Sequence, residues 1–552
     1  MTKKAKIHSN SCSSLLTFSP IPKSLCEVSV LDIPAPIIHA VPPEICAQIA
    51  QCSTRQTVSR LSLSSHRLYY VFSPLLYENI GNLTSTQTAR LLQTLNAGSC
   101  TWRTNPALFI AKLSLVEVPK ENLKFDASQT ALQNMHAASA SRLRSLHWGI
   151  TSGIDKLGAV ISTENFPRLK ELFVSCGDGG EVNTFSFMNK GGLEALGITL
   201  ELDLESPKIN HVTADRLLYK LAEAIRALPL TSPDLYTLQL HVQVHYPLDE
   251  LPDALSDLVD ALNSLKFRSL QSLDVCLKCI PVFDDDDYLC IDLTTFLNAH
   301  PQLTKLILNV PDTKLDKPAF ISSLRSFSGS VVDATHLLQQ KNIRLEELNV
   351  VHIHDSFYDP PLFLVPVFPS LSSLTKLSLS ANNHGGNMLK PFNHVSPLSL
   401  QSIATSFPNL THLSVPISDC MSAYKTCLWC LPRLQELRLC EYRVQDIPMG
   451  CPLAELFPSI MFVSEIRLLL GSLSELRLVA VTLLVDDGSM DDFCLECGCR
   501  SDVYVARMLD HEEMRVEYEF VVLRQEEVVM TFSEFVDKRV RRRPRTVPSH
   551  AE

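Results

Sequence analysis

The chain lacks the patterns that mark most enzymes and membrane proteins. No apolar run reaches the roughly 20 residues needed to cross a bilayer, and no compact apolar segment typical of a secretory signal follows the basic start Met1–Asn10. The phosphate-loop pattern Gly-x-x-x-x-Gly-Lys-Ser/Thr, the zinc-protease pattern His-Glu-x-x-His and the hydrolase pattern Gly-x-Ser-x-Gly are all absent from the sequence. We therefore expect a protein that is not an enzyme and has no catalytic residues, no cofactor and no membrane partner.

An excess of basic charge is missing as well. The 552 residues include 60 Asp and Glu against 49 Lys and Arg, a net charge of −11. Nucleic-acid-binding faces are usually basic, so we expect a protein partner and no nucleic acid. The 17 cysteines are scattered through apolar patterns, which is typical of reduced proteins and predicts a cytoplasmic and/or nuclear location.

Each of three local clusters can be interpreted either as a functional site or as ordinary sequence with no specific role. Cys494, Cys497 and Cys499 have a spacing compatible with zinc, but no fourth ligand is recognisable, so we expect no metal. The acidic run 284–287 lacks the order of a calcium loop, which favours a solvated loop. The basic tail 538–545 is compatible with a nuclear-import signal or with a solvated tail.

A short unit recurs through most of the chain. It has the form Leu-x-x-Leu-x-Leu, with other large apolar residues at some of these positions, and twelve copies are present. The shortest intervals, such as Leu169 to Leu193, match a leucine-rich repeat of about 20–29 residues. Longer intervals, such as Leu303 to Leu345, have room for loop insertions or degenerate repeats. The copies begin at Ile110, Leu143, Leu169, Leu193, Leu235, Leu270, Leu303, Leu345, Leu374, Leu410, Leu434 and Leu473.

The alternating leucines predict short strands with one buried face, and segments 214–227 and 254–265 between copies predict helices. One strand–helix unit cannot bury its own apolar face, whereas stacked units form a continuous core. We therefore predict an α/β leucine-rich-repeat solenoid. A protein substrate would contact the side chains between the leucines, with these as candidates: His147, Phe173, Gln239, Asp274, Ile307, Asn349, Arg438 and Arg477.

A small all-α module precedes the repeats. Pro43 suits the first turn of a helix, and Val41, Ile45 and Ile49 fall four residues apart on one face. The sequence Ser53–Gln56 is a capping-box pattern that starts a second helix, and a third apolar run begins at Leu68. Helices this short bury little by themselves and need a neighbour.

Residues 41–80 resemble an F-box of the type found in fungal F-box/leucine-rich-repeat proteins. The resemblance rests on V41-P-P-E-I45, on R60-L-S-L-S-S-H-R-L68 and on S73-P-L-L-Y-E-N-I80. It implies docking on the Skp-type adaptor of a cullin-type SCF ubiquitin ligase, with the repeats binding a substrate destined for degradation. By this resemblance the adaptor-binding residues are Val41, Pro42, Ile45, Ile49, Val58, Leu61 and Leu68.

The sequence thus predicts four segments and two candidate functions. The segments are a disordered leader at 1–37, the F-box-like module at 38–80, the solenoid at 81–480, and a C-terminal cap with a basic tail at 481–552; V503-Y-V-A-R and 516–523 read as strands. The main candidate function is a non-catalytic substrate adaptor of a ubiquitin ligase. The alternative is a leucine-rich scaffold with a vestigial F-box and no ubiquitin role, because Ala50 and Ser53 stand where the F-box family carries larger apolar residues.

Overall fold

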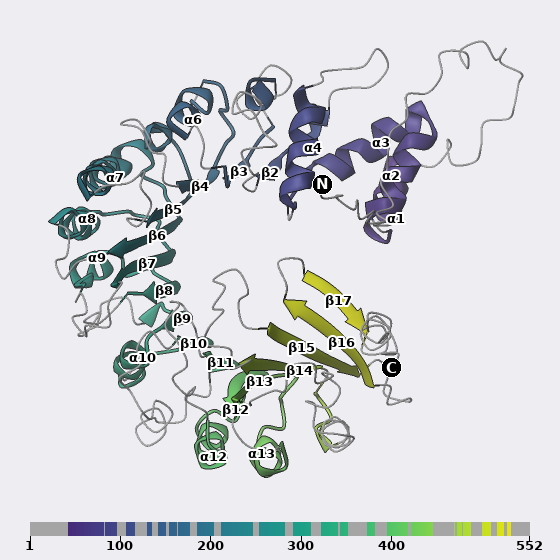
Figure 1. The fold of residues 1–552 in the computed structure, drawn as a ribbon, viewed down its shortest axis with the longest axis vertical. Coiled ribbons are helices and arrows are strands. Elements are labelled where there is room, and N and C mark those ends of the chain that lie inside the picture. Colours follow the sequence, from purple (N-terminus) through teal and green to yellow (C-terminus); the bar gives the residue numbers. More distant parts are fainter. Residues whose placement is uncertain are drawn as a thin grey trace, which may run out of the picture. The chain divides into compact units, whose positions relative to one another are not determined.

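The chain divides into a helical unit, Met1–Leu76, and a repeat unit, Tyr77–Glu552. Figure 1 shows the computed structural model from which the fold is described. The structure describes residues 42–53, 55–81, 83–96, 106–115, 130–134, 142–150, 154–162, 164–176, 185–203, 211–246, 253–281, 291–310, 322–340, 343–351, 373–380, 395–417, 421–444, 469, 472–476, 478–486, 500–508, 516–523 and 527–531.

The helical unit consists of α1 (Pro43–Gln51), α2 (Arg55–Ser64) and α3 (His66–Tyr77). Pro42 caps α1, and its carbonyl accepts the backbone N–H groups of Ile45 and Cys46, both at 3.1 Å. The core is small and contains Cys46, Val58, Leu68 and Phe72. The sequence-based prediction of three short helices is therefore confirmed, and their shared core is too small to cover all of their apolar side chains.

The repeat unit alternates strands with helices. Its helices are α4 (Ser85–Asn96), α6 (Ile154–Val160), α7 (His211–Thr231), α8 (Asp253–Asn263), α9 (Thr294–Asn298), α10 (Val331–Leu338), α12 (Pro397–Ser406) and α13 (Met421–Leu428), with 3-10 turns η3 (Pro106–Phe109) and η4 (Ser186–Asn189). Its parallel strands are β1 (Asn79–Ile80), β2 (Lys112–Leu115), β3 (Ser145–Trp148), β4 (Glu171–Cys176), β5 (Ala195–Asp203), β6 (Thr237–Tyr246), β7 (Ser272–Pro281), β8 (Lys305–Asn309), β9 (Ser326–Gly329), β10 (Glu347–Val351), β11 (Lys376–Ser380), β12 (His412–Ile417), β13 (Glu436–Val444) and β14 (Leu478–Asp486).

Each strand from β1 to β14 pairs in parallel with the next along the chain. The second residue of each strand from β2 to β13 is a leucine or, on β9, Phe327. It lies in register with its counterparts and is no more than 2% exposed, so these side chains form one continuous buried ladder. The copy that begins at Leu473 departs from this register, because β14 places Val479 and not Leu476 opposite Leu437. The helices α6 to α13 all lie along the same side of the strands in Figure 1. The predicted alternation of parallel strands and helices in a solenoid is therefore confirmed. The ladder consists of Leu113, Leu146, Leu172, Leu196, Leu238, Leu273, Leu306, Phe327, Leu348, Leu377, Leu413 and Leu437.

The long interval between Leu303 and Leu345 contains a degenerate repeat. Strand β9 pairs with both β8 and β10, and its Phe327 and the preceding Leu324 are fully buried. Gly329 stands where other copies have a large apolar residue, and a Cβ there would come within 2.5 Å of Cζ of Phe327. The Phe327 ring therefore fills the space of the missing third side chain.

The sheet changes direction at its C-terminal end. Strand β14 pairs antiparallel with β15 (Arg500–Met508), which continues antiparallel to β16 (Val516–Leu523) and β17 (Glu527–Thr531). The two strands predicted after residue 500 are present, and they continue the sheet beyond its last parallel strand. Among the described helices, none has the length and hydropathy that a bilayer-crossing segment requires.

His300 joins two neighbouring repeats from inside the core. Its Nε2 accepts the backbone N–H of Phe267 at 2.9 Å, so Nδ1 carries the proton and donates to the carbonyl of Phe296 at 2.6 Å. The side chain is fully buried. Burial lowers the pKa of His300, although the bond to Phe296 opposes this shift. The ring is therefore neutral in the folded protein, where a proton on Nε2 would remove the acceptor for Phe267.

We predict that His300 makes the fold acid-sensitive. Above its ordinary pKa of about 6.5 the ring is neutral in both folded and unfolded chains, whereas at lower pH the unfolded chain takes up the proton first and stability falls. The change H300F should remove this component between about pH 7.5 and 5.5 while lowering stability at the higher pH by about 1–3 kcal/mol, because Phe267 loses its acceptor. Urea-unfolding midpoints measure both effects. An unchanged pH dependence in H300F would contradict the assignment.

Candidate functional site

The candidate substrate-binding residues lie in a single row on the sheet surface opposite the buried leucines. We call this surface the open face and the row the central row. Its members are in direct register from strand to strand, and they run from Ser114 on β2 to Arg438 on β13. Of the eight predicted residues, Arg477 lies outside the described residues, and the central row brings the other seven together: His147, Phe173, Gln239, Asp274, Ile307, Asn349 and Arg438.

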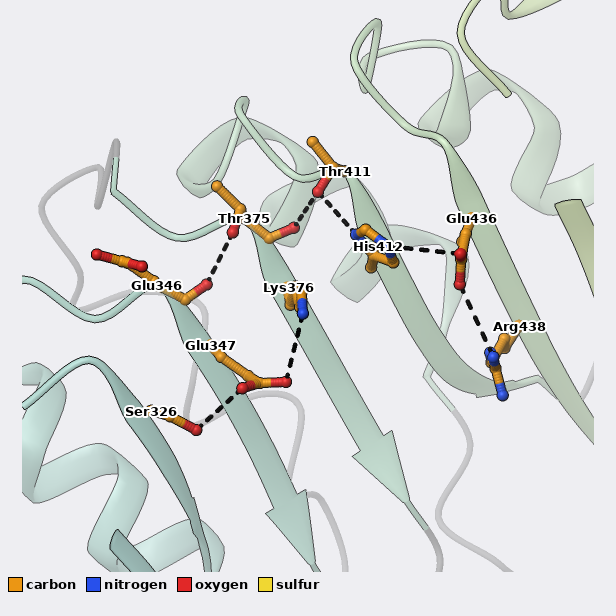
Figure 2. A network of polar contacts seen from close by, with 9 residues as sticks. All are labelled: Ser326, Glu346, Glu347, Thr375, Lys376, Thr411, His412, Glu436 and Arg438. Atoms are coloured by element: carbon orange, nitrogen blue, oxygen red, sulfur yellow. Dashed lines mark hydrogen bonds and ion pairs between the residues drawn. The ribbon is translucent and has the colours of Figure 1, made fainter. Parts of the chain in front are cut away.

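A second row lies two residues before the central one on each strand, and we call it the leading row. Over β9 to β13 its charges pair across strands (Figure 2). Glu347 accepts a hydrogen bond from Ser326 at 3.0 Å and lies 3.9 Å from Lys376. Glu436 lies 3.6 Å from His412 and 3.8 Å from Arg438. The cation that the sequence places in this part of the central row, Arg438, thus has a carboxylate beside it.

An aromatic pair marks the other end of the central row. The rings of His147 on β3 and Phe173 on β4 are stacked, with their centroids 4.3 Å apart and an interplanar angle of 22°. On the far side of Phe173, Gly197 leaves the space that the ring occupies, since a Cβ at this position would overlap it. Partial burial lowers the pKa of His147, a shift that Glu171 opposes and Lys112 reinforces. The pair therefore offers a largely uncharged aromatic surface.

A polar cluster lies next to it on β6 and β7. Nε2 of His241 lies 2.9 Å from Oδ1 of Asp274, and the amide nitrogen of Gln239 lies 3.4 Å from the same ring. His241 stands two residues after Gln239, in what we call the trailing row. It was not predicted, because only the positions between the leucines were candidates. The period-two alternation of β6 was the available signal. The cluster holds the Asp274 carboxylate in place on the open face.

The helical unit exposes only part of the predicted adaptor-binding set. Pro42 and Ile45 are exposed, Ile45 by 44%, and Ile49 and Leu61 are half-buried. Val58 and Leu68 are buried at 4% and 3% within the unit's own core. Val41 lies outside the described residues. Three large apolar side chains that the sequence did not single out are also exposed: Leu63, Tyr70 and Leu75.

Several predicted features fall outside the described part of the chain. These are Cys494, Cys497 and Cys499, the acidic run 284–287 and the basic tail. Within the described residues, no group of three or more His, Cys, Asp or Glu side chains is arranged to hold a metal ion.

Comparison with known proteins gives a distant likeness to another repeat protein. No protein-family model and no curated protein matches the chain. Among solved structures, it is similar to the leucine-rich-repeat ectodomain of the plant membrane receptor kinase GASSHO1/SCHENGEN3 from Arabidopsis thaliana, solved in complex with CASPARIAN STRIP INTEGRITY FACTOR 2. The identity is 12% and the TM-score 0.19, and the match covers 70% of this chain but only 45% of the other. A likeness this low adds nothing to what the repeats themselves show.

The stacked pair leads to a prediction about His147. Because Phe173 covers one face of the imidazole, F173A should expose the ring to water and raise the pKa of His147 towards its ordinary value. An NMR titration of the His147 ring protons measures the shift. N349A, a change in the same row on β10, should leave the pKa of His147 unchanged. A fall in this pKa in F173A would show that Phe173 does not desolvate the ring.

Proposed function

We propose that the protein is a substrate adaptor of a cullin-type SCF ubiquitin ligase. The helical unit docks on the Skp-type adaptor, and the open face of the repeat unit binds the protein to be ubiquitinated. The observation that carries the proposal is the apolar surface of a helical unit whose sequence resembles an F-box. Ile45, Leu63, Tyr70 and Leu75 are each between 39% and 53% exposed there.

The energetics of the helical unit support a partner. Fully burying one large apolar side chain contributes about 1.5–3 kcal/mol, and this unit leaves several of them partly in water. Its core contains four fully buried side chains, so the unit gains little stability from its own packing. Val58 and Leu68 would contribute indirectly. Their packing in the core would hold in place the helices that present Pro42, Ile45, Ile49 and Leu61 to the adaptor.

In this role the chain carries out no chemistry of its own. An adaptor accelerates transfer by holding the target lysine near the charged enzyme, which makes the reaction effectively intramolecular. The repeat unit suits such a task because its ladder of buried leucines holds the open-face side chains in fixed register. The expected setting is the cytoplasm and/or the nucleus, where cullin complexes act.

We predict that P42D combined with I45D abolishes adaptor binding and leaves the fold intact. Both side chains are exposed, aspartate is a favoured N-cap residue, and an acid in the first turn suits the helix dipole. Losing the burial of Ile45 alone should weaken binding at least roughly tenfold, and a buried charge should weaken it further. The affinity of the full chain for a purified Skp-type adaptor, measured by calorimetry, tests this.

The control is L398D, which places the same charge on a 77% exposed leucine of α12 and should leave adaptor affinity unchanged. Substitutions of Val58 or Leu68 would test the core and not the docking surface. If the wild-type chain binds neither the Skp-type adaptor nor a cullin complex, the alternative of a repeat scaffold with a vestigial F-box replaces the ligase proposal. Binding that survives the double change would place the docking surface elsewhere.

A further inference from the structure

Carboxylates without a lysine or arginine partner distinguish one part of the described open face from another. Among the described side chains on β5 to β7, Glu201 has no cation paired with it, and Asp274 contacts His241 but no lysine or arginine. On β9 to β13, Glu347 has a lysine beside it and Glu436 an arginine. The negative charge of the first region can therefore attract a cationic ligand, whereas the carboxylates of the second region are neutralised by neighbouring cations.

The same region is one of two broad parts of the described sheet, the other being β13 and β14 with 9 residues each. Strands β5, β6 and β7 are 9, 10 and 10 residues long, against 4 or 5 for β8 to β11. The acidic segment ends at β8, where Lys305 occupies the leading row and Ile307 the central row. Extra strand length adds exposed positions beyond Gln239 and Asp274, which gives a ligand more surface to contact.

Phe173 and Asp274 define two ends of this region. In the central row they are separated by Gly197, whose space the Phe173 ring fills, and by Gln239. The backbones of Phe173 and Asp274 are three strand steps apart, about 14 Å at roughly 4.8 Å each. An extended peptide rises about 3.3 Å per residue, so four residues cover this distance, and side chains four residues apart point to the same side.

We propose that the open face across β3 to β7 binds an extended peptide segment of its target with an apolar side chain against Phe173 and a lysine or arginine, four residues away, against Asp274. The segment lies across the strands, over the Phe173 ring and Gln239. His147 widens the apolar end by stacking on Phe173, and His241 fixes the carboxylate at the other end. The identity of the target as a ubiquitination substrate rests on the proposed function, whereas the chemistry of the peptide is set by this surface.

Fluorescein-labelled peptides test the proposal on the full chain. The probe Gly-Ser-Phe-Ser-Thr-Ser-Arg-Ser-Gly and its reversed sequence cover both chain directions. We expect saturable binding, by fluorescence polarisation, of at least one of the two. Moving arginine to three residues from phenylalanine, or replacing it with glutamate, should abolish binding. Failure of both probes to saturate, or equal binding of the glutamate peptide, would overturn the proposal.

Variants locate the site. D274N removes the charge, keeps the size of the side chain, and should weaken binding roughly tenfold, the scale of one charge-assisted hydrogen bond. D274K should abolish binding of the arginine probe and restore binding of the glutamate probe. The matched control E347Q, on the self-neutralised part of the face, should bind like the wild type. Unfolding midpoints check that each variant is folded, and unchanged affinity in both Asp274 variants would place the site elsewhere.

Adaptor affinity, measured on the same samples, separates the two proposals. Peptide binding without adaptor binding would reject the ligase function and keep the peptide site. Adaptor binding without peptide binding would reject the peptide site and keep the ligase function.

Discussion

One backbone interaction, repeated at the start of each strand from β2 to β13, holds the repeats in register. The carbonyl of Arg144 accepts the N–H groups of Lys170 and Glu171 at 2.8 and 3.0 Å, and the same paired acceptance continues from repeat to repeat as far as Thr411. Threonine hydroxyls strengthen it where Thr375 and Thr411 donate to the preceding carbonyl (Figure 2). Because each repeat is fixed to the one before, the register of the strands is fixed. Each central-row side chain, two residues into the strand, therefore lies beside a defined residue of the neighbouring strand.

Period and register could be predicted from the sequence, but side-chain packing could not. Alternating leucines identified the strands, because successive residues of a strand point to opposite faces. The residues between the leucines therefore form a row on the open face. The sequence could not predict β9, where the Phe327 ring fills the space of a missing apolar side chain and disguises the motif. It also could not separate Ile45 from Val58: both are apolar residues at helical spacing, and only the packing of three helices decides which one is buried.

Charge on the open face depends on cross-strand neighbours and not on any one repeat. Read along the chain, Arg438 makes the C-terminal repeats basic, but Glu436 on the same strand and His412 on the preceding one form a chain of contacts with it. Exposed pairs of this kind contribute less than about 1 kcal/mol each to stability. These pairs also leave little free charge on β9 to β13 for a partner to contact. The negative charge available on the described open face therefore lies mainly on β5 to β7, where Glu201 and Asp274 have no lysine or arginine partner.

The polar cluster on β6 and β7 needs a position beyond the central row, which the 4-residue strand β9 lacks and the 5-residue strands β8 and β10 just reach. His241 lies two residues beyond the central row, and a strand must continue past that row to hold such a side chain beside Asp274. Strand β9 ends at Gly329, directly after its central-row residue. Long strands persist only beside long neighbours, because the backbone groups that extend past a short neighbour have no strand to pair with. The trailing row is therefore present on every described strand from β2 to β13 that has at least five residues, and on β6 it carries the histidine that contacts the Asp274 carboxylate.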